Sequence, residues 1–217
     1  MHDFEYVSAN EWKPVRAELN EIIHKLQDEV RDHFTFQYQF VGSSSRKMIT
    51  CEKRSNIGYD FDVDLEVNDP DKNYSPEAIR TILRKGLDNV TNPYGFPFFG
   101  YDYTEDSTRV LTIKVKDRKN ARIMHSCDFC IIYKCGDGRQ QYIRYNKAQH
   151  SYRWEYQPKG YQHLPDKIDW IKEHGLWGEV RQLYLSKKNL NDNPHKHSRT
   201  IFAETVHEVW QKNQKNP

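Results

Sequence analysis

Two stretches decide the fold of this chain: Val41-Gly42-Ser43-Ser44 and Tyr59-Asp60-Phe61-Asp62-Val63-Asp64-Leu65-Glu66-Val67. Successive side chains of a strand point to opposite faces, so the apolar residues of the second stretch share one face and its carboxylates share the other. Neighbouring like charges repel, and no fold gains stability from such a row alone. The stretch therefore predicts a strand with one buried face and one face that holds something cationic.

The composition indicates a globular protein. Only 36% of the 217 residues are hydrophobic, but 14 Tyr, 10 Phe and 5 Trp can bury large areas, which argues against disorder. This length suffices for one sizeable core, or for one domain with an appendage. No stretch is typical of a signal peptide, and no apolar run approaches the roughly 20 residues of a membrane span. We therefore expect a cytoplasmic protein with no membrane partner.

The cysteines do not predict a disulfide scaffold, because four are too few for a chain of this length. They are Cys51, Cys127, Cys130 and Cys135. His125 lies near the last three and raises the alternative of a zinc site. However, residues 126–133 read as one continuous strand, in which Cys127 and Cys130 face opposite sides. We expect buried free thiols at these positions rather than a metal.

Hydrophobic periodicity predicts an α+β fold. Ser8-Ala9-Asn10-Glu11 has the form of a capping box, and Ser75-Pro76 places an N-cap before a proline at the first helical position. The spacing of apolar residues predicts helices over residues 8–31, 75–90, 168–185 (with Gly175 as a candidate break) and 198–211, and strands over residues 34–40, 59–67, 109–115, 126–133 and 142–145. We expect a mixed β-sheet flanked by helices over residues 1–160, and a C-terminal helical extension packed on it over residues 161–217.

Asp128 is a candidate third carboxylate. It stands in an otherwise apolar strand, where a lone Asp is costly unless it is paired or binds a metal. A buried salt bridge with an arginine is the structural alternative. Metal-assisted phosphoryl transfer needs carboxylates that converge on one or two magnesium ions. Same-face neighbours on a strand lie about 6.6–7 Å apart, so two Asp side chains can lean together over such a pair of ions.

The order of these features resembles the nucleotidyltransferase superfamily typified by DNA polymerase β. That family has an apolar residue followed by Gly-Ser, an Asp-apolar-Asp strand, and a distant third Asp on a neighbouring strand. Here the matching residues are Val41-Gly42-Ser43, Asp60-Phe61-Asp62 and Asp128, and the resemblance covers roughly residues 10 to 135. The gap between Gly-Ser and the first Asp is longer than the family pattern. The strand also carries two candidate pairs, Asp60/Asp62 or Asp62/Asp64, of which the first keeps the gap shorter.

The resemblance implies a nucleotidyltransferase-like catalytic domain with specific roles for these residues. Gly42, Ser43 and Ser44 would bind the nucleotide, the glycine by letting the backbone approach the triphosphate and the serines by contacting its phosphates. Asp60, Asp62 and Asp128 would be catalytic and would hold two Mg²⁺ or Mn²⁺ ions. The reaction would transfer NMP from ATP or another NTP to a hydroxyl acceptor and release pyrophosphate.

Within the superfamily, the pattern looks most like the bacterial relatives of cyclic GMP-AMP synthase and oligoadenylate synthase, which implies a nucleotide second messenger as one candidate product. The acceptor stays open among a small molecule, a nucleotide, an RNA end and a protein hydroxyl. The alternative function is a catalytically inactive nucleotide- or metal-binding module of the same fold. A third interpretation treats the acidic strand as a solvated face of a structural protein.

Residues 142–156 interleave aromatic side chains with arginines. This pattern is typical either of base stacking or of a hairpin that packs its aromatic face on the core. From Lys134 onward basic residues outnumber acidic ones, whereas the preceding residues carry a net negative charge. An acidic front and a basic rear suit a metal site that faces a phosphate-bearing substrate, although a surplus of this size is also ordinary for a protein surface.

Overall fold

The computed structural model describes residues 2–95, 100–158, 160–161 and 163–214. The chain forms two compact units. The first, which we call the sheet unit, consists of Val7–Ile49 and Asn56–Gln157, and the second, the helical unit, consists of Met1–Tyr6, Thr50–Ser55 and Pro158–Pro217. The domain division expected between residues 160 and 161 stays a prediction.

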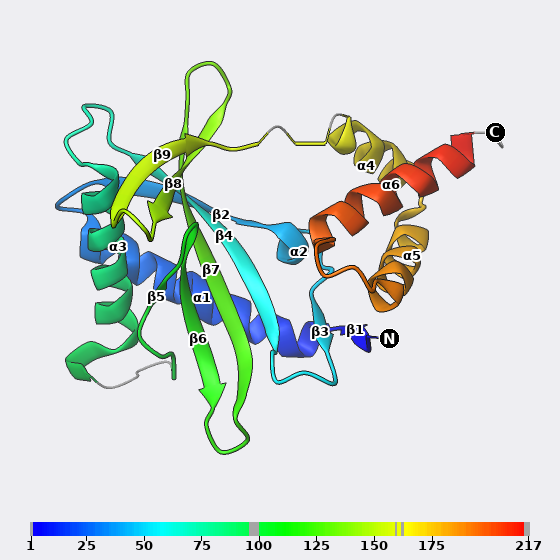
Figure 1. Ribbon diagram of the computed structural model, residues 1–217, viewed down its shortest axis with the longest axis horizontal. Coiled ribbons are helices and arrows are strands. Elements are labelled where there is room, and N and C mark those ends of the chain that lie inside the picture. Colours follow the sequence, from blue (N-terminus) through cyan, green and yellow to red (C-terminus); the bar gives the residue numbers. More distant parts are fainter. Residues whose placement is uncertain (1, 96–99, 159, 162, 215–217) are drawn as a thin grey trace. The chain divides into compact units, whose positions relative to one another are not determined.

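The sheet unit is built on a mixed sheet, as the sequence predicts. Five strands follow the order β2 (Thr35–Val41), β4 (Tyr59–Asn68), β7 (Arg122–Lys134), β6 (Val110–Asp117) and β5 (Glu105–Asp106). The hairpin of β8 (Gln140–Asn146) and β9 (Ser151–Tyr156) joins the sheet through β7. Strands β4 and β7 are parallel and the other pairs are antiparallel. Figure 1 shows the long strands side by side.

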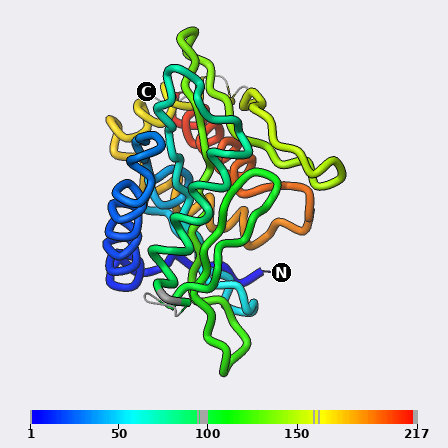
Figure 2. Tube along the Cα trace, turned by 90° about the vertical axis from the view of Figure 1, so that its left-hand side faces the viewer, coloured from blue at the N-terminus to red at the C-terminus, as the bar shows by residue number. Residues whose placement is uncertain are grey.

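Helices α1 (Ala9–Val30) and α3 (Pro76–Thr91) lie side by side and cover one face of this sheet (Figure 2). The Tyr59 hydroxyl of β4 donates to the main-chain oxygen of Glu11 in α1 at 3.3 Å. Arg80 of α3 donates to the Asp106 carboxylate of β5 at 2.8 Å. The side chains of β4 and β7 that share this covered face are fully buried: Phe61, Val63, Leu65, Cys127, Phe129 and Ile131. The carboxylates of β4 point to the opposite face, which we call the open face.

The predicted starts of α1 and α3 are confirmed, whereas α4 (Leu164–Glu173) begins four residues before the expected start, and the strands β6 and β7 are longer than expected. The capping box of Ser8 and Glu11 is formed, and Ser75 accepts from the main-chain nitrogen of Ala78. The ladder of β6 and β7 extends to the pair Asp117 and Arg122, although both are polar. The alternation of apolar and polar residues does not reveal such pairs, because side chains at the end of the hairpin do not pack on the core. A short 3₁₀ helix, η1 (Pro93–Gly95), follows α3.

The helical unit contains α4 (Leu164–Glu173), α5 (Trp177–Leu190) and α6 (Ser198–Gln214), together with a two-stranded sheet of β1 (Phe4–Tyr6) and β3 (Thr50–Glu52). The predicted break near Gly175 is confirmed, because this glycine adopts φ +70° between α4 and α5. None of the helices in the described ranges is long and apolar enough to span a membrane.

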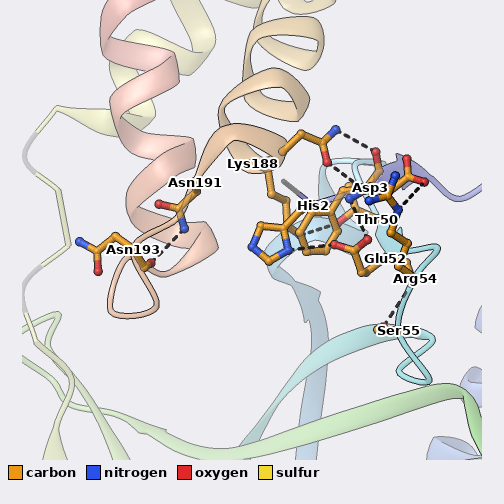
Figure 3. Close-up of polar contacts among 11 residues, drawn as sticks. His2, Asp3, Thr50, Glu52, Arg54, Ser55, Lys188, Asn191 and Asn193 are labelled. Atoms are coloured by element: carbon orange, nitrogen blue, oxygen red, sulfur yellow. Dashed lines mark hydrogen bonds and ion pairs between the residues drawn. The ribbon is translucent and has the colours of Figure 1, made fainter.

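The C-terminal end of α5 holds β1 and β3 through polar side chains (Figure 3). Asn189 accepts from the main-chain nitrogen of Phe4 at 2.6 Å and donates to its main-chain oxygen at 3.1 Å. Lys188 donates to the Thr50 hydroxyl at 2.6 Å. The Asn189 amide therefore attaches β1 to α5 as a strand partner would, and Lys188 attaches β3.

Candidate active site

The three predicted catalytic carboxylates lie together on the open face. Asp62 of β4 is the register partner of Asp128 of β7, and Asp60 precedes Asp62 by two residues on the same face. The row continues through β6 and β5, because Thr112 is the partner of Asp128 and Glu105 is the partner of Thr112. Three carboxylates from two parallel strands thus share one region of a sheet surface.

The Gly-Ser turn closes on this row from the other side. Strand β2 ends at Val41, the partner of Asp62, and the short helix α2 (Gly42–Ser45) begins at the next residue. Gly42 has φ +64°, and a Cβ there would lie 2.3 Å from Asp62 Oδ2. Glycine is therefore needed both for the left-handed backbone and for the space that the Asp62 carboxylate occupies. A contact between Gly42 and a triphosphate stays a prediction.

The two serines after Gly42 are placed differently. The Ser44 side chain is fully buried, and its hydroxyl donates to the main-chain oxygen of Val41 at 2.9 Å. Ser43 is half-buried, and no partner is found for its hydroxyl among the described residues. A hydroxyl can donate only one hydrogen bond. The Ser44 hydroxyl uses its own within the turn, whereas the Ser43 hydroxyl can donate to a phosphate. The nucleotide-binding role of both serines stays a prediction.

Burial and neighbouring negative charges disfavour the ionised forms of Asp62 and Asp128. Burial, together with the charges of the neighbouring Asp60 and Asp128, raises the pKa of Asp62 to about 7, against the opposing charge of Arg46. Burial also raises the pKa of Asp128, while the hydrogen bond from Thr112 lowers it. The row therefore carries more negative charge than the surrounding groups balance, as the sequence pattern indicates.

The neighbours of the carboxylates favour Asp60/Asp62 over Asp62/Asp64 as the pair that acts with Asp128. The charge of Asp60 contributes to the raised pKa of both Asp62 and Asp128. The charge of Asp64 also raises the pKa of Asp62, but Asp64 lies opposite Cys130, and burial raises its own pKa against a hydrogen bond from Gln140. The assignment of the pair stays a prediction.

The donor chemistry fits magnesium or manganese, because carboxylate oxygens are the ligands that these hard cations prefer. Within the described part of the chain, however, no three or more His, Cys, Asp and Glu side chains are already gathered around one point as a metal site. The Asp128 carboxylate is turned to Thr112 of β6. Ligation by all three carboxylates therefore requires their side chains to turn toward a common ion.

The cysteine cluster divides between the two faces of the sheet, as the alternation predicts. Cys127 is buried on the covered face, and Cys130 lies on the open face beside Asp64. His125 also points to the covered face, where it contacts the Tyr101 hydroxyl at 3.0 Å and stacks on Tyr59. The four cysteines are free.

The aromatic side chains of the hairpin of β8 and β9 pack against neighbouring side chains on both faces of the sheet. On the covered face, Tyr152 donates to Asp106 and stacks on Tyr145. On the open face, the Arg109 guanidinium lies over the Tyr142 ring at 4.3 Å. Tyr142 is nearly fully buried, so its ring is not available to stack on a base. The packed hairpin accounts for these aromatic side chains.

Comparison with solved structures identifies the architecture. The structure of DncV from Vibrio cholerae with GTP bound aligns over 94% of this chain and 52% of DncV, with a TM-score of 0.57 and 15% sequence identity. The chain has the nucleotidyltransferase fold. A second DncV structure, described as a cyclic AMP-GMP synthase and a prokaryotic cGAS homolog, aligns over 94% of this chain and 53% of DncV with a TM-score of 0.57 and 14% identity.

The structure of the CD-NTase CdnG from Bradyrhizobium diazoefficiens in complex with GTP aligns over 80% of this chain and 42% of CdnG, with a TM-score of 0.46 and 13% identity. The chain spans about half the length of the DncV structures that it matches. The expected likeness to bacterial relatives of cyclic GMP-AMP synthase is thus confirmed for the fold. Neither a protein-family model nor a curated protein matches the sequence.

Sequence reasoning missed Thr112, the hydrogen-bond partner of Asp128. Strand β6 was predicted, and the alternation of buried Leu111 and Ile113 places Thr112 on the open face. What the sequence lacks is the register that sets Thr112 opposite Asp128. The turn between β6 and β7 and the β-bulge at Val115 and Lys116 together set that register.

Proposed function

We propose that this chain is a metal-dependent nucleotidyltransferase that transfers NMP from an NTP to a hydroxyl acceptor and releases pyrophosphate. The observation that carries the proposal is the row of Asp62 and Asp128 on adjacent parallel strands, with Asp60 on the same face and Gly42 against Asp62. A cluster of carboxylates that includes Asp62 and Asp128, whose pKa values are raised by burial and by neighbouring charges, is the expected setting for divalent cations.

In this proposal, Asp60, Asp62 and Asp128 would hold two Mg²⁺ or Mn²⁺ ions. Bound there, the ions would neutralise the phosphate charge and lower the pKa of the acceptor hydroxyl. The Ser43 hydroxyl would donate a hydrogen bond to the phosphates, and Asp128 would accept the proton of the acceptor hydroxyl. The acceptor oxygen forms a bond to the α-phosphorus as the bond to the β-phosphate oxygen breaks, so pyrophosphate leaves.

Analogy with DncV narrows the candidate nucleotide substrates, the acceptor and the product. DncV has been solved with GTP and with 3'-deoxy ATP, so we propose that ATP and GTP are the first nucleotides to test. DncV is described as a cyclic AMP-GMP synthase, which favours a second nucleotide as acceptor and a nucleotide second messenger as product. A cytoplasmic location would supply these substrates, and free cysteines suit its reducing conditions.

A catalytically inactive binding module is the second candidate. Such a module would bind NTP and metal without turnover. It predicts nucleotide-dependent stabilisation but no pyrophosphate.

The test is pyrophosphate release from each of the four NTPs with Mg²⁺ or Mn²⁺, for the wild type and Asp62→Asn. Asp32→Asn is the matched control, because Asp32 is an exposed residue at the end of α1. We expect release that requires both the metal and Asp62 and that Asp32→Asn retains. Metal-dependent thermal stabilisation by NTP without release would support the binding module. The absence of both pyrophosphate release and NTP-dependent stabilisation would contradict both functions.

A further inference from the structure

Thr112 contacts one catalytic carboxylate directly. Its hydroxyl donates to Asp128 Oδ1 at 2.6 Å, within the range of about 2.5–2.7 Å for a hydroxyl on an ionised carboxylate. Thr112 is 7% exposed, and its χ1 angle is stiff because the side chain is β-branched. The hydrogen bond therefore joins a well-fixed donor to the carboxylate.

The other neighbours of Thr112 do not compete with Asp128 for the hydrogen bond from its hydroxyl. On the opposite side of β6, the register partner of Thr112 is Glu105, whose carboxylate could compete for the same proton. Lys114 donates to Glu105 Oε2 at 2.5 Å and forms an ion pair with it. Because Glu105 is paired with Lys114, the hydroxyl of Thr112 donates its hydrogen bond to Asp128.

We infer that Thr112 is a positioning residue for the metal site, and this inference rests on the proposed function. Strands β6 and β4 flank β7 on opposite sides, so a hydrogen bond from β6 to Oδ1 leaves Asp128 Oδ2 for an ion shared with Asp62 of β4. Valine would fill the same space in a strand, which makes the hydroxyl the property that matters. Thr112 thus restricts how far Asp128 can turn when it binds a metal.

The test measures Mn²⁺ binding by electron paramagnetic resonance for Thr112→Val and Thr112→Ser. A lost partner of a metal ligand typically weakens metal affinity by about 10–100-fold. We expect this loss in Thr112→Val and recovery to near the wild-type affinity in Thr112→Ser. If the proposed activity is present, Thr112→Val lowers kcat and leaves the KM for the NTP nearly unchanged.

Thr205→Val is the matched control, because Thr205 is a fully buried threonine of α6 whose hydroxyl donates to the main-chain oxygen of Ile201. We expect it to change the melting temperature but not the Mn²⁺ affinity. If Thr112→Val does not fold, Thr112→Ala replaces it with the same expectation.

The outcomes separate this inference from the proposed function. Wild-type Mn²⁺ affinity in Thr112→Val, or an equal loss in Thr112→Ser, overturns the role of Thr112 and leaves the proposed function standing. Mn²⁺ binding that depends on Thr112 without pyrophosphate release overturns the transferase and supports the positioning role. Absence of any Asp62-dependent Mn²⁺ binding in the wild type contradicts both.

Discussion

Replacing Gly42 with alanine should damage the site through two separable effects. The backbone at φ +64° costs a non-glycine residue roughly 1–2 kcal/mol. The new Cβ would also lie 2.3 Å from Asp62 Oδ2, so the Asp62 side chain must turn away, at a cost on the order of 0.5–1.5 kcal/mol if it leaves its rotamer. We expect Gly42→Ala to lower the free energy of unfolding of the sheet unit by about 2–3 kcal/mol.

Gly138→Ala separates these effects. Gly138 lies in the turn between β7 and β8 with φ +79°, and nothing lies within 4 Å of a Cβ built there. Its substitution should cost the backbone strain alone and leave Mn²⁺ affinity unchanged. Urea unfolding and Mn²⁺ titration of both variants measure the difference.

A double variant isolates the clash with Asp62. In Gly42→Ala/Asp62→Ala, the carboxylate that meets the new Cβ is gone, so the alanine at position 42 should cost only the backbone strain. The two substitutions should therefore be strongly non-additive. Additive costs, together with wild-type Mn²⁺ affinity in Gly42→Ala, would refute the role assigned to this close approach.

Three further predictions concern stability. The pKa of Asp62 rises from 3.8 to about 7 on folding, so in metal-free buffer the wild type should lose stability as the pH rises between these values, by at most about 4 kcal/mol. Asp62→Asn should remove that dependence and be the more stable protein at pH 8, as urea titrations across pH would show. Arg80→Met should cost about 3–5 kcal/mol, measured by thermal unfolding, because Arg80 is 1% exposed and its loss leaves Asp106 without its cation. Asn189→Ala should cost about 1–3 kcal/mol and speed amide hydrogen exchange at Phe4, whereas unchanged exchange would refute the attachment of β1 by Asn189.

Much of the sheet unit could be predicted because its local signals agree with its tertiary structure. The alternation in β4 places Phe61 in the core and Asp62 on the open face, and the capping box begins α1 at the expected position. Gly42 and Asp62 were predicted to act together from a resemblance. The structure adds a physical reason, because the carboxylate occupies the space that a side chain at position 42 would fill.

The parts that could not be predicted depend on contacts between distant segments. Strands β1 and β3 are three residues each, too short for a periodic signal; they pair with each other, and β1 also bonds to Asn189. Arg80 reads as a surface residue of an amphipathic helix, yet it is buried and donates to Asp106 and to main-chain oxygens of neighbouring strands. Thr112 meets Asp128 only through the register of β6 and β7. Such contacts arise from topology, which the local sequence does not encode.

Anomalous diffraction from crystals of the full chain soaked with Mn²⁺ and a non-hydrolysable NTP analogue tests the metal site most directly. We expect manganese peaks within coordination distance of the carboxylates of Asp60, Asp62 and Asp128, at about 2.0–2.6 Å from their oxygens. Peaks elsewhere on the chain, or none on the open face while the nucleotide is bound, would contradict a catalytic role for this row of carboxylates.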